Sequence, residues 1–316
     1  RYKLSDEDLP KILSLLRKYN IRYLFLIGGN DTMYTLARIE SYCSKNDYSL
    51  IGIGVPKTVD NDLYGTDHTP GYPSAAKYVA LSVQQSGQLA RDMQRVDSFV
   101  THQTVGRDAG WLAASAALAK FEKGDPPHLI YLPERPLSKD RFLGDVENCM
   151  KQYGWVYIVC GEGIVWEDGR PVSASKQSDN FANVEFGAMG GGSAAINLHG
   201  LISSRFGMRG EFQITESLSM AAADRVTERD REEAYNCGVE AMKLAGEGKS
   251  GYMVSIERVN DKPYQAGFGA VNLAEAGERS KAMPSHFING EGNFPSEDFL
   301  DYIRPLLEDE ISPYPQ

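Results

Sequence analysis

The chain has 316 residues, 42% of them hydrophobic, and its 33 Lys and Arg against 43 Asp and Glu give a formal net charge of −10. This composition excludes a disordered or fibrous chain, and the length predicts two domains, because a domain usually holds roughly 100–200 residues. The acidic balance argues against general binding of nucleic acid or anionic membranes, which needs a basic surface. No stretch of the sequence approaches the roughly 18 apolar residues that a membrane-spanning helix needs.

Short apolar runs alternate with longer amphipathic segments along most of the chain, which is typical of a parallel sheet covered by helices. The expected strands are residues 23–27, 50–55, 98–102, 129–132, 155–160 and 252–256. The expected helices are residues 9–19, 33–44, 74–94, 110–121, 139–153 and 230–245. This alternation predicts a doubly wound α/β fold, in which ligands bind beyond the carboxyl ends of the strands.

The chain begins at Arg1 without Met and runs directly into Leu4-Ser5-Asp6, which reads as the capped start of a helix. We therefore expect a further segment before Arg1 in the complete protein. The four cysteines form no C-x-x-C pair, and the five histidines lack the spacing of a zinc site. Widely separated, reduced cysteines are typical of a cytoplasmic protein, and we expect that location.

The first candidate junction joins the strand 23–27 to the next helix through Gly28, Gly29, Asn30 and Asp31. The glycines let the backbone come close to a ligand, and the N–H groups at the helix start favour a phosphate. Asp31 repels a bare phosphate unless a divalent cation or a lysine lies between them. The junction therefore fits either a phosphate-binding turn or a glycine turn with an Asx cap.

The second junction follows the strand 50–55 and contains Lys57, Thr58, Asp60 and Asp62. In an extended segment residues two apart point the same way, so Asp60 and Asp62 can converge. One carboxylate can take a proton from an alcohol and the other can hold Mg²⁺, while Lys57 neutralises charge on a transferring phosphoryl group. The structural alternative is a polar Asx-turn on the surface.

Two later junctions carry further candidates. Gly106 and Arg107 follow the strand 98–102, and Arg107 can bind a phosphate oxyanion with its guanidinium fork. A salt bridge of Arg107 with Asp108 is the structural alternative. Glu162 lies between two glycines after the strand 155–160, where a carboxylate can accept hydrogen bonds from sugar hydroxyls but is also a common structural feature.

Together these junctions resemble those of the phosphofructokinase family. The run P-K-T-V-D-N-D at 56–62 is very similar to the family's P-x-T-[IV]-D-N-D loop. The run G-G-N-D-T at 28–32 resembles its Mg²⁺ and phosphate turn, and G-R-D-A-G at 106–110 resembles its sugar-phosphate turn. The runs Y-L-P-E at 131–134 and G-E-G at 161–163 follow in the family's order, so the resemblance covers nearly the whole chain.

This resemblance implies two doubly wound, Rossmann-like lobes. Residues 1–72 with about 221–285 would form the phosphoryl-donor lobe, and residues 73–220 with about 286–316 the sugar-phosphate lobe. The family opens with a strand and a glycine-rich phosphate loop that do not occur at the start of this chain. We therefore expect the donor lobe to lack its first strand and loop here, with only three clear strands.

The resemblance also implies residue roles. Asp60 would be the base that deprotonates the 1-hydroxyl of fructose 6-phosphate, with Lys57 and Thr58 as the other catalytic residues. The substrate-binding residues would be Gly29, Asp31, Thr58, Asp62, Gly106, Arg107, Glu162 and Arg209. Arg209 competes for its role with Arg205. Asn30 and Asp62 would bind Mg²⁺, although a neutral amide at position 30 binds a hard cation less strongly than the carboxylate found in many relatives.

Two positions indicate the phosphoryl donor. Members of the family that use ATP usually have glycine where this chain has Asp31 and Lys57, whereas members that use pyrophosphate resemble this chain at both positions. A carboxylate at position 31 would repel the α-phosphate of ATP, and Lys57 adds positive charge for compact pyrophosphate. We therefore expect pyrophosphate as the donor.

The resemblance thus implies a Mg²⁺-dependent transferase that moves a phosphoryl group from pyrophosphate to fructose 6-phosphate, in glycolysis or gluconeogenesis. One alternative is an ATP-dependent phosphofructokinase, and another is a non-catalytic regulatory subunit. The intact set of Lys57, Thr58, Asp60 and Asp62 argues against the second, because such a set has little structural purpose. As in the family, we expect a homo-oligomer, either a dimer or a tetramer.

Overall fold

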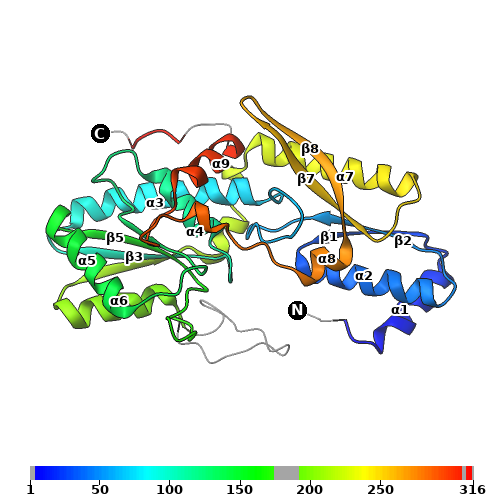
Figure 1. Ribbon diagram of the computed structural model, residues 1–316, viewed down its shortest axis with the longest axis horizontal. Coiled ribbons are helices and arrows are strands. Elements are labelled where there is room, and N and C mark those ends of the chain that lie inside the picture. Colours follow the sequence, from blue (N-terminus) through cyan, green and yellow to red (C-terminus); the bar gives the residue numbers. More distant parts are fainter. Residues whose placement is uncertain (1–3, 174–191, 308–310, 315–316) are drawn as a thin grey trace. The chain divides into compact units, whose positions relative to one another are not determined.

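The computed structural model describes residues 4–173, 192–307 and 311–314 (Figure 1). The chain divides into two compact units. Unit 1 comprises Arg1–Tyr72 and Glu228–Lys281, and unit 2 comprises Pro73–Thr227 and Ala282–Gln316. The assignment of a donor lobe and a sugar-phosphate lobe to these parts of the chain stays a prediction.

Unit 1 contains a four-stranded sheet in the order β1-β2-β7-β8. Its elements are α1 (Asp8–Lys18), β1 (Tyr23–Gly28), α2 (Asn30–Lys45), β2 (Ile51–Pro56), α7 (Glu228–Gly246), β7 (Tyr252–Asp261), β8 (Tyr264–Asn272) and α8 (Leu273–Glu278). The first three strands of the sheet are parallel, and β8 pairs with β7 as an antiparallel hairpin.

Helices cover both faces of this sheet, as Figure 1 shows, with α7 on one face and α2 and α8 on the other. Ile53 and Val55 of β2 pack in one buried cluster with side chains of α7. Between them, Gly54 faces α2, where a Cβ atom would lie 2.3 Å from Met33 Sδ. The glycines of β2 therefore let α2 pack directly on the strand, and this close packing fixes the start of α2 beside the end of β2.

Unit 2 contains a second four-stranded sheet, in the order β4-β5-β3-β6, and all its strands are parallel. Its longer elements are α3 (Tyr72–Met93), β3 (Phe99–Thr104), α4 (Trp111–Ser115), β4 (Leu129–Tyr131), α5 (Lys139–Tyr153), β5 (Val156–Gly161), α6 (Ala194–Phe206), β6 (Gly210–Ile214) and α9 (Glu297–Leu307). Short 3₁₀ turns are η1 (Ala116–Ala119), η3 (Glu216–Met220), η4 (Ala223–Arg225) and η5 (Ser285–Phe287).

The central strands β3 and β5 of this sheet are buried along their whole length. Alternate residues of β5, including Val156 and Ile158, pack with α5 and α6. Tyr157 points to the opposite face, where its hydroxyl group contacts Ser86 Oγ of α3 at 2.6 Å and His102 Nδ1 at 2.7 Å. A parallel sheet buried on both faces explains why these strands read as nearly continuous apolar runs.

The α/β fold class predicted from the sequence is confirmed, and all six predicted strands are present. Five of them differ from the prediction by one or two residues at an end, whereas β7 extends five residues beyond the predicted end at 256. The helix predicted at 110–121 is wrong beyond Ser115, where the chain turns into the 3₁₀ helix η1. The Ser115 hydroxyl donates to the carbonyl oxygen of Leu112 at 2.6 Å, a side-chain bond that competes with regular α-helical bonding.

Several elements were not anticipated. They are the strands β6 and β8 and the helices α6, α8 and α9. The expectation of only three strands in the first lobe is wrong, because β8 makes a fourth. The glycine-rich sequence of β8 and the polar, partly buried β6 lack the apolar run that identified the other strands.

All four cysteines are buried and free. Among the described residues, no helix combines the length and the apolar character needed to cross a membrane.

Candidate functional site

The first two junctions lie side by side in unit 1. Strands β1 and β2 pair in parallel with Gly28 opposite Pro56, so both chains leave the sheet at the same edge. The main-chain N–H of Lys57 donates to the carbonyl oxygen of Gly28 at 3.0 Å. A Cβ atom at Gly29 would lie 3.6 Å from the Lys57 carbonyl oxygen, so the two turns are in direct contact. The structure therefore brings together the residues predicted to handle the phosphoryl donor.

Helix α2 begins at this edge, with Gly29 as its N-cap. The main-chain N–H groups of Thr32 and Met33 donate to the Gly29 carbonyl oxygen at 2.9 and 3.1 Å. The alternative of a turn with an Asx cap is therefore wrong, because glycine occupies the cap position. Asp31 lies in the first turn of the helix with its side chain exposed. A helix N-terminus without a side-chain cap leaves main-chain N–H groups available for an anion.

Asn30 and Asp62 meet at the same place. Asn30 Nδ2 donates to Asp62 Oδ2 at 3.4 Å, whereas Asn30 Oδ1 is buried without a hydrogen-bond partner in the described part of the chain. Within that part, no group of three or more His, Cys, Asp and Glu side chains is arranged to hold a metal. Mg²⁺ commonly uses one or two protein oxygens and completes its shell with substrate phosphates and waters. A buried amide oxygen beside a carboxylate fits that requirement.

The loop after β2 has a fixed conformation. The main-chain N–H of Asp60 donates to Thr58 Oγ1 at 3.2 Å, and the Thr69 hydroxyl donates to the Thr58 carbonyl oxygen at 2.7 Å. Thr58 also forms an isolated parallel bridge with Gly71. Asn61 is fully buried and has a positive φ of 55°. These contacts exclude the alternative of a simple polar turn on the surface, since much of the loop is buried in unit 1.

Lys57 extends from the same edge with an exposed side chain. No ion pair of its ammonium group is recorded within the residues that the structure describes. The lysine is therefore available to a ligand, while its main chain is held by the bond to Gly28.

Sequence reasoning missed Lys281, which follows α8 and reaches the same loop. Its Nζ atom donates to Asn61 Oδ1 at 3.1 Å and to the carbonyl oxygens of Thr66 and Asp67 at 3.1 and 2.6 Å. Burial lowers the pKa of Lys281 to about 7, although the charges of Asp67 and Asp62 oppose this shift. No short motif marks this lysine, because its contacts lie more than 200 positions earlier in the sequence.

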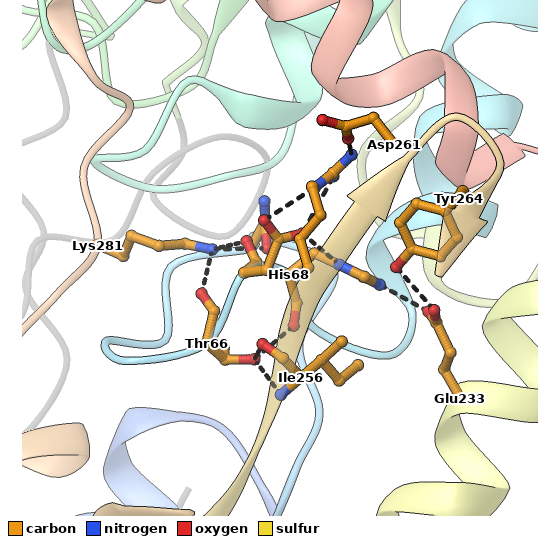
Figure 2. Close-up of polar contacts among 10 residues, drawn as sticks. Thr66, His68, Glu233, Ile256, Asp261, Tyr264 and Lys281 are labelled. Atoms are coloured by element: carbon orange, nitrogen blue, oxygen red, sulfur yellow. Dashed lines mark hydrogen bonds and ion pairs between the residues drawn. The ribbon is translucent and has the colours of Figure 1, made fainter. Parts of the chain in front are cut away.

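A second missed feature is the polar network that continues from Lys281 (Figure 2). The buried His68 ring lies between Asp67 Oδ2, at 2.8 Å from Nδ1, and Glu233 Oε2, at 2.6 Å from Nε2. Arg258 donates to both oxygens of Asp67 at 3.1 and 3.0 Å, and the Tyr264 hydroxyl donates to Glu233 Oε1 at 2.8 Å. The network joins the loop to α7, β7 and β8.

The charges of this network shift two pKa values. Burial alone would lower the pKa of His68, but its hydrogen bonds to two carboxylates raise it above the usual value. Burial would raise the pKa of Asp67, but the hydrogen bonds from His68 and Arg258 lower it to about 2. The hydrogen bonds of this network therefore favour protonated His68 and ionised Asp67, whose opposite charges compensate each other.

In unit 2 the structure brings together Gly106, Arg107 and Glu162. One carboxylate oxygen of Glu162, Oε1, accepts hydrogen bonds from the main-chain N–H groups of Gly106 and Arg107 at 3.1 and 2.9 Å. The Glu162 main-chain N–H in turn donates to the Thr104 carbonyl oxygen at 3.0 Å. The two predicted turns therefore meet beyond the carboxyl ends of β3 and β5.

The backbone of this turn has little freedom. Gly106 has a φ of 143° and Arg107 a φ of 50°, both in a region that L side chains rarely adopt. A Cβ atom at Gly163 would lie 1.9 Å from the Arg107 carbonyl oxygen. The glycine at 163 is therefore required for the two turns to approach each other.

The Arg107 side chain itself is exposed, and so is Asp108. No ion pair of Arg107 is recorded in residues 4–173, 192–307 or 311–314, so the alternative of a salt bridge to Asp108 is not supported. A fixed main chain with an exposed guanidinium group suits the binding of an anionic ligand.

Arg209 is not brought to this turn. It precedes β6, next to the start of β3, where it forms an ion pair with Asp97 at 2.7 Å. Gly106 and Arg107 lie beyond the other end of β3, and a strand of six residues spans about 17–20 Å. Within one chain, Arg209 is therefore on the opposite edge of the sheet from Arg107 and Glu162.

Glu134, in the Y-L-P-E run, contributes a buried carboxylate near Gly110. Its Oε1 accepts hydrogen bonds from the main-chain N–H groups of Gly110 and Met283 at 2.9 and 3.0 Å. Oε2 is buried and has no hydrogen-bond partner among the described residues. Burial raises the pKa of Glu134. Its contacts give it a structural role, in holding the start of α4.

Comparison with known proteins decides the family. Residues 1–245 match the family described as Phosphofructokinase. The chain belongs to the phosphofructokinase family. The resemblance predicted from the junctions is thereby confirmed.

Several proteins match 91% or more of this chain, and some of their names refer to pyrophosphate. The chain is 34% identical to a pyrophosphate–fructose 6-phosphate 1-phosphotransferase of Halomonas elongata, covering 99% of this chain and 75% of that protein. It is 32% identical to a sulfofructose kinase of Alkalicoccus urumqiensis, covering 91% of this chain and 73% of that protein. A crystal structure of a pyrophosphate-dependent phosphofructokinase from Marinobacter aquaeolei has a TM-score of 0.84 and 31% identity, with 100% of this chain and 74% of that one covered. These likenesses confirm the predicted fold as that of a phosphofructokinase.

Proposed function

We propose that this chain transfers a phosphoryl group from pyrophosphate to the 1-hydroxyl of fructose 6-phosphate. The observation that carries the proposal is the edge of the unit 1 sheet, where the turn at Gly29 contacts the loop with Lys57 and where Asn30 meets Asp62. Phosphoryl transfer needs positioned carboxylates, cations and N–H groups more than it needs covalent chemistry. The Halomonas elongata relative has a name that describes this reaction.

In the proposed mechanism the residues of unit 1 act on the reacting groups. Asp60 accepts the proton of the attacking hydroxyl group as the bond to phosphorus forms, which is general base catalysis. Lys57 neutralises negative charge on the transferring phosphoryl group. Thr58 Oγ1 already accepts the N–H of Asp60, so its own hydrogen is directed to another acceptor, and a phosphate oxygen is the acceptor we assign.

We assign Mg²⁺ to Asn30 and Asp62. The buried amide oxygen of Asn30 and the adjacent carboxylate are the hard oxygen ligands that this ion prefers. When bound, the ion neutralises charge on the phosphates and orients them. Because the Asn30 amide is neutral, the two side chains together carry little negative charge. We therefore expect Mg²⁺ to bind tightly only when the phosphate groups of the donor are also present.

We assign the sugar phosphate to Arg107 of unit 2. Its exposed guanidinium group is held on a turn whose main chain is fixed by Glu162 and by the close approach of Gly163. We assign Glu162 an indirect role, which is to hold the main chain of the turn that carries Arg107, since its Oε1 atom already accepts two main-chain N–H groups. Arg209 lies at the other edge of the sheet, so we assign it no role in the site of its own chain.

Two exposed side chains support pyrophosphate over ATP as the donor. Asp31 lies in the first turn of α2 and Lys57 at the end of β2, on junctions that touch each other. The carboxylate of Asp31 repels the additional α-phosphate that ATP carries. The ammonium group of Lys57 favours pyrophosphate, which is a compact and highly charged donor.

An ATP-dependent phosphofructokinase would differ from this proposal only in the donor. A non-catalytic regulatory subunit is disfavoured by the placement of Lys57, Asp60 and Asp62 on one fixed loop beside the start of α2. Homo-oligomeric assembly and a cytoplasmic location are further predictions from the sequence that accompany the proposal.

The test is a steady-state assay of the purified chain with fructose 6-phosphate, Mg²⁺ and either pyrophosphate or ATP. We expect turnover with pyrophosphate and a much lower kcat/KM with ATP. Turnover with ATP alone would overturn the choice of donor, and no turnover with either would overturn the proposed activity. Sulfofructose, in parallel reactions, tests whether the acceptor is instead the one named for the Alkalicoccus urumqiensis relative.

A further inference from the structure

Lys281 ties together two parts of the loop that follows β2. Its Nζ atom donates to Asn61 Oδ1 near the start of this segment and to the carbonyl oxygens of Thr66 and Asp67 at its far end. Its own main-chain N–H donates to the carbonyl oxygen of Asp62 at 2.7 Å. Figure 2 shows the lysine side chain reaching the loop from the segment after α8.

The residue between the two carboxylates depends on this anchor. Asn61 lies between Asp60 and Asp62 in the chain, is fully buried, and has a φ of 55°. A non-glycine residue keeps such a conformation only where its surroundings hold it. Asp60 and Asp62 are bonded directly to Asn61 through the main chain. A change in the φ or ψ angle of Asn61 therefore moves the two carboxylates relative to each other.

We propose that Lys281 is a positioning residue for phosphoryl transfer, which holds Asn61 and the main chain of Asp62 so that the carboxylates of Asp60 and Asp62 point at the reacting groups. This inference rests on the proposed function, because the roles of the two carboxylates do. A lysine suits the task, since in its ammonium form one nitrogen presents three donors, and here it meets three oxygen acceptors.

Packing alone does not require a lysine at this position. Methionine has a similar length and fills space without the cost of burying a charge. Lys281 also differs from Arg258, whose guanidinium group donates to the side chain of Asp67. Arg258 therefore holds the far end of the loop, and Lys281 joins that end to the catalytic carboxylates.

The first test compares Lys281→Met with wild type in steady-state assays at saturating Mg²⁺. We expect kcat to fall about 10–100-fold, because small misplacements of catalytic groups have effects of this size, with KM for fructose 6-phosphate changed less than about twofold. Lys281→Arg, which keeps a charge and donors, should recover part of kcat. Lys262→Met, at an exposed lysine of the β7–β8 hairpin, is the matched control and should leave kcat unchanged. Wild-type kcat in folded Lys281→Met would overturn the proposal.

A second variant removes the partner instead of the lysine. Asn61→Gly deletes the acceptor while allowing the positive φ, so it should lower kcat by a similar factor, and adding it to Lys281→Met should cause little further loss. If Lys281→Met does not fold, Asn61→Gly and Lys281→Arg decide the question. Independent, additive effects of the two substitutions would contradict a shared role.

Hydrogen exchange separates this inference from the proposed function. In Lys281→Met we expect faster amide exchange in residues 60–67, with unchanged exchange in α7, and this readout does not depend on turnover. Unchanged exchange in residues 60–67 would overturn the anchoring role of Lys281. A wild-type protein without phosphotransferase activity would overturn the proposed function and, with it, the catalytic meaning of the anchor.

Discussion

The two units hold their candidate residues in different ways. In unit 1, the loop with Asp60 and Asp62 is fixed by charged side chains from distant parts of the sequence, namely Lys281, Arg258 and the His68 pair with Glu233. In unit 2, the turn with Arg107 is fixed by main-chain contacts, with Glu162 accepting two N–H groups and Gly163 packed against a carbonyl group. The first region is therefore sensitive to loss of charge, and the second to added volume.

The largest effect is expected from the base proposed in unit 1. Asp60→Asn keeps the size of the side chain but removes its capacity to accept a proton, so kcat should fall about 10²–10⁴-fold. The thermal unfolding midpoint should stay within a few degrees of wild type, because Asp60 is only partly buried. Steady-state kinetics and a melting curve on the same sample check this prediction, and near-normal turnover would remove Asp60 from the mechanism.

The next largest effect is expected from added side-chain volume at the Arg107 turn of unit 2. Gly163→Ala places a Cβ atom where only 1.9 Å separates it from the Arg107 carbonyl oxygen, so the turn must shift. We expect KM for fructose 6-phosphate to rise about 10-fold or more, with a smaller effect on kcat, because charge-assisted phosphate contacts contribute about 1.5–3 kcal/mol.

A matched control for this variant is Gly144→Ala. Gly144 lies inside α5, where an added Cβ atom would meet no packing neighbour within 4 Å among the described residues, so alanine should stabilise the helix by about 0.5–1 kcal/mol and leave KM unchanged. An equal rise in KM for both variants would show that the effect at Gly163 is not local to the Arg107 turn.

A smaller change is expected in donor choice. Asp31→Gly removes an exposed carboxylate from the first turn of α2, so it should lower the discrimination against ATP by about 10-fold, measured as the ratio of kcat/KM for the two donors. If ATP remains as poor a donor as before, charge and crowding at Asp31 do not set the preference, and Lys57 becomes the residue to change.

The smallest expected effect is on the way the melting temperature depends on pH. Protonated His68 pairs with two carboxylates, so its folded pKa is raised above 6.5. The stabilisation is complete below pH 6.5 and is lost as the pH rises through the raised value, so the melting temperature should fall as the pH rises from 6.5 through that value. His68→Gln should reduce this dependence, whereas His286→Gln, at an exposed histidine, should keep it. An unchanged pH profile in His68→Gln would exclude the pair as its source.

The contrast between the units also explains what could be predicted from the sequence. The strand ends and the residues that follow them could be predicted, because apolar runs mark the strands. The candidate residues could be recognised because each group, 28–32, 56–62 and 106–110, is contiguous in the sequence. The predicted features depend on local sequence and on one general rule of α/β sheets. The structure adds the pairing of β1 with β2, which places Gly29 beside Lys57.

Contacts between distant positions could not be predicted in this way. Lys281 and Asn61 are 220 residues apart, and His68 and Glu233 are 165 apart, with no motif at either partner. The placement of Arg209 also required the register of β6 with β3. The glycine-rich β8 was missed because its stability comes from pairing with β7 more than from its own residues.

The most direct test of the proposed activity is phosphorus NMR of the purified chain with pyrophosphate, fructose 6-phosphate and Mg²⁺, beside Asp60→Asn as a control. We predict that wild type converts pyrophosphate into orthophosphate and fructose 1,6-bisphosphate in equal amounts, and that Asp60→Asn does so at least about 100-fold more slowly. Pyrophosphate that persists with wild type, or orthophosphate released without phosphorylated sugar, would contradict the account.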